Sequence, residues 1–227
     1  MPELLICREV RRVKITLTRR LLREKNAAVG IGTLIIFIAM ILVAGITASV
    51  IIQTMNSLEQ QALQTGLETM RDVSSGLRVT QVSGYNNGST ISQIAIFLRN
   101  TAGSDDIDLT YAYISLSDTS KSVILNFNTS IFNSSVSGGL FGTLDDTNLT
   151  ESTYGLMVVR DVDNSCVPTN PTINNDDLVV LLVNSSACFS GIDPRTEVSG
   201  NVVPEFGISG LISFTTPSAY INTIIEL

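Results

Sequence analysis

The feature that most constrains this chain is a long stretch without any charged side chain. After Lys25, no Asp, Glu, Lys or Arg appears until Glu59. Within that gap, residues 34–52 (LIIFIAMILVAGITASVII) contain only Thr47 and Ser49 as polar groups. About 20 such residues form a helix that crosses about 30 Å of hydrocarbon. The sequence therefore predicts a helix that can sit in a membrane.

Charge is divided sharply between the two sides of this run. Residues 1–27 carry eight Lys/Arg and three acids, a net +5, whereas residues 28–227 carry six and eighteen, a net −12. Positive charge before an apolar segment stays cytoplasmic, which sends the acidic body outside. A body so poor in basic residues cannot neutralise a row of phosphates, so no nucleic-acid partner is expected. The chain also has no histidine, which excludes His-based catalytic triads and His-containing metal sites.

Three interpretations compete for an apolar run behind a basic leader. The first is a secretory signal, but its apolar core is about 7–15 residues long, so this run is too long for it. A permanent signal anchor would keep residues 34–52 in the membrane. If a peptidase cuts in front of the run, the run becomes the N-terminus of the mature chain. It can then leave the membrane only by packing against copies of itself.

The helix is predicted to continue beyond the apolar run. Residues 53–75 place apolar side chains mostly at three- and four-residue steps, which is typical of an amphipathic helix. These side chains are Met55, Leu58, Ala62, Leu63, Leu67, Met70 and Val73. Gly76 is the predicted stop. From Ala28 to Gly76 the helix would be about 70 Å long at about 1.5 Å per residue, more than one domain of this size can bury by itself.

Beyond Gly76 the pattern changes to short runs of Val, Ile, Thr and Tyr separated by Gly, Asn, Asp and Ser, which predicts β-strands. The expected strands are Leu77–Val82, Ile91–Arg99, Asp108–Leu116, Ser122–Phe127, Tyr154–Val162, Leu178–Val183, Glu197–Val203 and Leu211–Thr215, with Ile221–Glu226 as a further candidate. Several short strands without intervening helices favour a β-sandwich. The expected fold class is α+β: a long N-terminal hydrophobic α-helix followed by an Ig-like antiparallel β-sandwich.

Two separated segments resemble one family. Gly30–Ile52 (GIGTLIIFIAMILVAGITASVII) is similar to the N-terminal segment of archaeal flagellins (archaellins) of the GIGTL type, and Arg195–Leu227 is similar to their closing segment. The resemblance implies a subunit without enzymatic activity or cofactor that polymerises into the extracellular filament of the archaeal flagellum, for swimming. The implied filament-core residues are Gly30, Gly32, Leu34, Ile35, Ile38, Leu42 and Ile46.

The resemblance also implies how the mature N-terminus arises. Archaellins lose a class III leader two residues before the first Gly of GIGTL, which here is the bond between Ala27 and Ala28; cleavage after Asn26 is the alternative. The implied partners are a signal peptidase of the preflagellin type, the membrane before assembly, and other copies of this chain or other archaellins. The expected parts are a leader (1–27), a filament-core helix (28–76) and an outer β-sandwich domain (77–227).

The nearest rival is an adhesive filament subunit of the type IV pilin kind. Pilins usually carry Glu at the fifth mature position, where this chain has Gly32. No carboxylate is then available there to pair with a neighbouring subunit's amino terminus, which favours an archaellin. A surface protein anchored permanently by Leu34–Ile52 is a more distant alternative.

The body contains five N-x-Ser/Thr sequons, at Asn87, Asn128, Asn133, Asn148 and Asn184; Asn170 is excluded because Pro171 follows it. Five are more than an intracellular chain is expected to hold, although abundant Asn, Ser and Thr produce some matches by chance. We expect roughly two to four to carry glycans if the cell modifies its surface proteins. Because a glycan needs solvent, these sites should face away from a filament core.

Of the three cysteines, Cys7 lies in the basic leader, which leaves Cys166 and Cys188 as an even pair in the body. Outside the cell, such a pair predicts one disulfide. Two buried free thiols are the alternative.

Acidic clusters in the body offer oxygen atoms of the kind that calcium prefers, with Asp161, Asp163 and Asn164 as the first candidates. None has EF-hand spacing, so solvated loop charge is expected and no metal is predicted. Paired carboxylates can also hydrolyse glycosides. The chain has no tryptophan and no evident aromatic platform for a sugar, which argues against that enzyme class.

Overall fold

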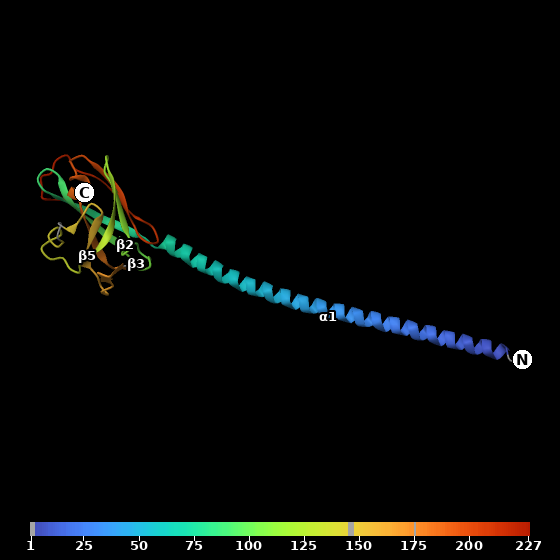
Figure 1. Cartoon of the computed structure of the whole chain (residues 1–227). Coiled ribbons are helices and arrows are strands. Elements are labelled where there is room, and N and C mark those ends of the chain that lie inside the picture. Colours follow the sequence, from blue (N-terminus) through green and yellow to red (C-terminus); the bar gives the residue numbers. More distant parts are fainter. Residues whose placement is uncertain (1–2, 145–147, 175) are drawn as a thin grey trace. The chain divides into compact units, whose positions relative to one another are not determined.

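The computed structural model describes residues 3–144, 148–174 and 176–227, with side chains from Val29 onward. The chain divides into two compact units, Met1–Gln64 and Thr65–Leu227. A single helix, α1, runs from Glu3 to Ser74 and is followed by strands that continue to the C-terminus (Figure 1). The predicted helix is confirmed, and it also includes the described part of the leader.

The helix ends two residues before the predicted stop because the Ser75 carbonyl bonds outside the helix. The Ser75 N–H donates to the Arg71 carbonyl at 2.9 Å, and the Ser75 carbonyl accepts from Ile208 N–H at 2.9 Å. Gly76 then forms a parallel bridge with Ile208. The chain therefore enters the β-structure at Ser75, which is buried.

Residues 77–227, called the β-domain below, contain twelve strands and one short helix among the described residues. The strands are β1 (Leu77–Asn86), β2 (Ile91–Asn100), β3 (Ile107–Asp108), β4 (Tyr113–Ser117), β5 (Ser122–Asn133), β6 (Thr153–Arg160), β7 (Cys166–Val167), β8 (Asn170–Ile173), β9 (Leu178–Asn184), β10 (Glu197–Val203), β11 (Gly210–Thr215) and β12 (Ile224–Glu226). The helix α2 (Ser185–Phe189) follows β9 directly.

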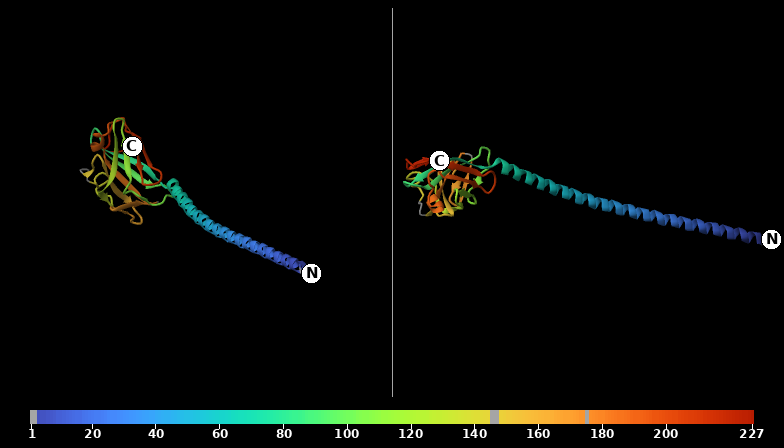
Figure 2. Two further views of the ribbon diagram at one scale, coloured as in Figure 1. Left: turned by 45° about the vertical axis from the view of Figure 1, so that its right-hand side comes forward. Right: turned by 90° about the horizontal axis from the view of Figure 1, so that it is seen from above.

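Nine of these strands form one sheet in the order β11-β10-β4-β5-β6-β9-β2-β1-β12, and β3, β8 and β7 form a small second sheet. Neighbouring strands are antiparallel except for β5 and β6, which are parallel. The last strand, β12, pairs with the first, β1, so these two strands lie side by side (Figure 2). The prediction of a mainly antiparallel β-domain is confirmed.

The large sheet differs from a sandwich of two separate sheets because β5 joins its two halves. Residues Ser122–Asn126 of β5 pair with β4, and the pairing with β6 starts at Asn126 and continues to Asn133 across a register shift between Phe127 and Phe132. Residues from both halves, such as Leu98 of β2 and Ile212 of β11, belong to one buried cluster. The sheet thus encloses its own core.

The core is apolar and closed. Tyr154 is the largest of its fully buried side chains, and its hydroxyl donates to the Ala112 carbonyl at 3.0 Å. Burial raises the pKa of this phenol. A second buried cluster combines Ala95, Ile131, Met157, Val180 and Leu182 of the sheet with Leu144 and Leu149 of the segment between β5 and β6.

One predicted strand is wrong in its middle. Asp108–Leu116 is divided into β3 and β4, because the Thr110 N–H donates to Asp108 Oδ1 at 2.7 Å and Ala112 N–H donates to the Leu109 carbonyl at 3.2 Å. These bonds close a turn in place of a strand. β7, β8 and α2 were not predicted, because they are too short to show a periodic pattern of apolar residues.

Candidate functional site: the exposed apolar helix

The apolar half of α1 presents its side chains to the outside along its whole length. From Val29 to Ser74 the helix is long and apolar enough to cross a membrane, with a mean hydropathy of 2.9 over its best 18-residue window, and none of that window is buried. The predicted filament-core residues all lie here, and Ile38, with 48% exposure, is the least exposed of the large ones. Because Ile35, Ile36, Phe37 and Ile38 follow one another, apolar groups cover every side of the helix. A helix apolar all round must be buried by something else.

Three threonines of this segment do not oppose such burial. Thr33 Oγ1 donates to the Gly30 carbonyl at 2.9 Å, and Thr54 Oγ1 donates to the Ile51 carbonyl at 2.8 Å. Thr47 Oγ1 likewise donates to the Val43 carbonyl. Each hydroxyl is satisfied within its own helix, so it can enter an apolar environment without losing a hydrogen bond.

The predicted glycines of the helix leave space on its surface. A Cβ added at Gly30 or Gly32 would meet no atom within 4 Å. Small residues let another backbone approach closely, as at helix interfaces in membranes. Ala27 and Ala28, the predicted cleavage pair, lie within α1, and their side chains are outside the described residues.

The last turn of α1 is attached to loops of the β-domain through Arg71. Its guanidinium carbon lies 3.8 Å from the centre of the Phe206 ring, and its Nε lies 3.3 Å from Asp105 Oδ2. Next to it, Gly207 has φ of +88°, and a Cβ there would come within 2.5 Å of the Ser75 carbonyl oxygen. This junction fixes the last turn of the helix to the β-domain.

The five sequons occupy different environments. Asn87 and Asn148 are exposed, whereas Asn128, Asn133 and Asn184 are half-buried. Two of the half-buried amides already donate hydrogen bonds: Asn133 Nδ2 to the Thr143 carbonyl at 3.4 Å and Asn184 Nδ2 to the Leu149 carbonyl at 3.3 Å. Asn184 also caps α2, since its side chain accepts from Ala187 N–H. The exposed pair is therefore the more accessible.

The predicted disulfide between Cys166 and Cys188 is wrong, because both are buried free thiols. Cys166 lies near Asp177, and Asp177 is the residue directly before β9. Cys188 lies in α2, which directly follows β9, so the two cysteines lie near opposite ends of this strand. The length of β9 is roughly 20 Å at about 3.3 Å per residue, far beyond the roughly 7 Å limit between bridged Cα atoms. Burial raises the pKa of Cys166 to about 12 and that of Cys188 to about 11, so both thiols are kept protonated and unreactive.

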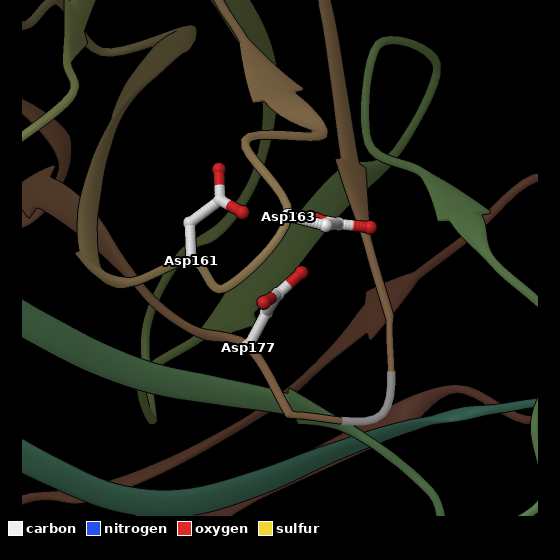
Figure 3. A group of neighbouring side chains, drawn as sticks. All are labelled: Asp161, Asp163 and Asp177. Atoms are coloured by element: carbon white, nitrogen blue, oxygen red, sulfur yellow. The ribbon is translucent and has the colours of Figure 1, made fainter.

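Three carboxylates come together in the loops before β7 and β9. Asp161, Asp163 and Asp177 place one oxygen each within 4.8 Å of one another (Figure 3). Asp161 and Asp163 were predicted as first candidates together with Asn164, whereas Asp177 was assigned to a separate acidic cluster because it is distant in sequence. Asn164 has φ of +60° in the same loop as Asp161 and Asp163.

These carboxylates already accept hydrogen bonds from the loops around them. Asp161 accepts from the N–H groups of Asn164 and Cys166, and Asp177 from those of Val162 and Asn174. A hydrogen bond with Ser165 lowers the pKa of Asp163, whereas burial raises the pKa of Asp177. The group ties the two loops together, and its oxygen atoms are of the type that hard divalent cations bind.

The described residues combine a β-domain that has its own buried core with a helix whose large apolar side chains are exposed from Val29 onward. This is the class of protein whose helix needs a membrane or other helices to cover it. Residues 27–214 match the model of the archaeal-type flagellin family. The chain is 43% identical over 204 residues to Flagellin B2 of Methanocaldococcus jannaschii, covering 89% of this chain and 94% of that protein. It is 39% identical over 210 residues to Flagellin B4 of Pyrococcus abyssi, covering 87% and 96%. The chain therefore belongs to the archaeal-type flagellins, a family of structural filament subunits.

Solved structures agree with this assignment. The crystal structure of an archaeal flagellin, FlaB1, from Methanocaldococcus jannaschii matches with a TM-score of 0.60 and 35% identity, covering 67% of this chain and 96% of that one. The archaeal flagellum of Methanospirillum hungatei matches with a TM-score of 0.61, covering 86% and 98%. At 17% identity, the second match concerns the fold alone.

Proposed function

We propose that this chain polymerises into the extracellular filament of the archaeal flagellum, with α1 in the filament core and the β-domain in the outer wall. The observation that carries the proposal is that large apolar side chains from Val29 to Val73 remain 48–70% exposed. If packing hides on the order of 1,000 Å² of this surface per subunit, the gain at about 25 cal/mol per Å² is on the order of 25 kcal/mol before ordering costs. A polymer held in this way resists dissociation and can act as a propeller.

Before assembly, the same helix is proposed to hold the precursor in the membrane, with the basic leader in the cytoplasm. A signal peptidase of the preflagellin type then cuts between Ala27 and Ala28. The match to the family model begins at residue 27, which supports this position. The released helix leaves the lipid only when the helices of other copies replace it.

We further propose that glycans decorate the outer wall. Asn87 and Asn148 are the first acceptors because they are exposed. Asn184 is the least available because both ends of its amide are engaged. The proposal thus divides the five sequons by their side-chain environment.

Filaments purified from a cell that makes this chain test the proposal. N-terminal sequencing is expected to give Ala28 as the first residue, and an intact leader would sink the filament assignment in favour of a permanent anchor. Deleting the gene is expected to abolish or weaken swimming. Unchanged swimming with lost surface attachment would instead support an adhesive pilin-like filament.

A further inference from the structure

Two arginines lie directly opposite each other on β1 and β2. Arg78 pairs with Arg99 in the antiparallel register, and their side chains are exposed and half-buried, respectively. Together with Asn100, Ala102 and Gly103 they line a cavity of about 310 Å³. Like charges directly opposite each other destabilise a strand pair, so an anion bound between the two guanidiniums would stabilise this placement.

The chain itself does not supply that anion within residues 29–144, 148–174 and 176–227. In this described part, Arg71 is paired with Asp105, Lys121 with Glu151, and Arg160 with Asp176. No such ion pair is formed there by Arg78 or Arg99. Residues 28–227 hold eighteen acids and six basic residues. Two adjacent guanidiniums left unpaired in so acidic a body point to a carboxylate from another molecule.

Asn100 adds a buried polar group to the cavity wall. It is 7% exposed, and its Nδ2 donates to the carbonyls of Asp105 at 3.0 Å and Ile173 at 3.2 Å, which fixes the amide. Its Oδ1 is buried and has no hydrogen-bond partner in the described structure. This acceptor can take one guanidinium N–H, which leaves the other N–H groups of the pair for a carboxylate.

We propose that Arg78 and Arg99 bind the Glu59 carboxylate of a second copy of this chain, an inference that rests on the proposed assembly through α1. Glu59 is exposed and is the first acid after the charge-free run. Glu68 and Asp72 flank Arg71 on their own helix, whereas no basic residue lies within three turns of Glu59. Glu59 also lies fifteen residues before Ser74, about 22 Å along a helix.

The proposed contact matches the chemistry of both partners. A guanidinium presents parallel N–H groups that fit the two oxygens of a carboxylate, and such charge-assisted bonds are stronger than neutral ones. Two guanidiniums around one carboxylate also remove the repulsion between Arg78 and Arg99. In a polymer the contact repeats at every subunit, so it fixes the register between neighbouring copies.

The test measures subunit release from purified filaments at a fixed elevated temperature over a series of NaCl concentrations. The Arg78→Gln/Arg99→Gln double variant is expected to release roughly tenfold more subunit than the wild type at low salt. The difference should shrink as salt screens the wild-type contact. Arg195→Gln is the matched control, because it removes the same charge from an exposed arginine that has no ion pair in the described structure.

Charge reversal then identifies the partner. Arg78→Glu/Arg99→Glu is expected to prevent stable filaments, and adding Glu59→Arg to the same chain is expected to restore them. A misfolded β-domain could not be rescued from α1, so restoration separates docking from folding. Wild-type release by the double Gln variant, or no restoration by Glu59→Arg, would overturn the contact. The variant Ile38→Asp puts a charge on the apolar surface of α1. If it abolishes filaments in that case, the proposed assembly through α1 stands without this contact.

Discussion

The helix α1 and the β-domain use the same kinds of apolar residues in opposite ways. In the β-domain, Leu98, Ile114 and Leu181 are fully buried within one chain. In α1, Leu34, Leu42 and Ile46 are all about 60% exposed or more. The β-domain therefore obtains its hydrophobic stabilisation from its own fold, whereas the described structure leaves the apolar surface of α1 exposed.

Polar groups show the same contrast. The β-domain satisfies the buried Tyr154 hydroxyl through a distant part of the chain, by its hydrogen bond to the Ala112 carbonyl. The hydroxyls of Thr33, Thr47, Thr54 and Thr69 in α1 bond to carbonyls three or four residues away. These polar groups are satisfied locally, whereas the large apolar side chains of the helix are exposed. The difference predicts that mutations in the two regions separate assembly from folding.

The largest effect is expected from Ile38→Asp, which puts an unpaired charge into the packed helices. Burying such a charge costs far more than one subunit contact can offset, so filaments should be absent by electron microscopy. The β-domain should keep its circular dichroism and its unfolding transition. Ile38→Val is the control, since it changes volume without adding charge and should leave filaments intact. Normal filaments from Ile38→Asp would contradict packing through α1.

The next largest effect is a difference in stability between the same substitution, Leu to Ala, made in each of the two regions. Leu98→Ala removes a fully buried side chain and should lower the free energy of unfolding of the β-domain by about 2–5 kcal/mol. Leu42→Ala makes the same chemical change at a residue that is 61% exposed, and it should leave that unfolding transition unchanged. Denaturant unfolding followed by circular dichroism measures both. A similar loss from the two substitutions would mean that α1 packs on its own β-domain.

Sequence alone was sufficient for the part of α1 that follows the leader because its signals are local. A charge-free run after Lys25 and a stripe up to Val73 need no knowledge of distant contacts. The main strands were also predictable, since Val, Ile and Tyr runs between turn residues have a clear period. Their order was not, because the pairing of β12 with β1 joins residues at opposite ends of the β-domain.

The candidate sites follow the same division. Gly30, Ile38 and the other predicted filament-core residues lie in one continuous segment, and its resemblance to archaellins is what implies them. Asp177 was not joined with Asp161 and Asp163, because only the fold brings these loops together. The Cys166–Cys188 pairing failed for a related reason: an even number of cysteines says nothing about β9 lying between them.

The smallest effect concerns Arg71, where the two regions join. Its ion pair with Asp105 is about half exposed, so solvent screens it, and its stacking on Phe206 adds a contact of similar size. Arg71→Met keeps most of the side chain's length and should lower the free energy of unfolding of the β-domain by about 1 kcal/mol. A double-mutant cycle with Asp105→Asn, measured by denaturant unfolding, isolates the ion pair. A coupling energy near zero would mean that the junction is held by the Phe206 ring and by the backbone bonds between Ser75 and Ile208. If Arg71→Met instead lowered the free energy of unfolding by well above about 2 kcal/mol, Arg71 alone would set the end of α1.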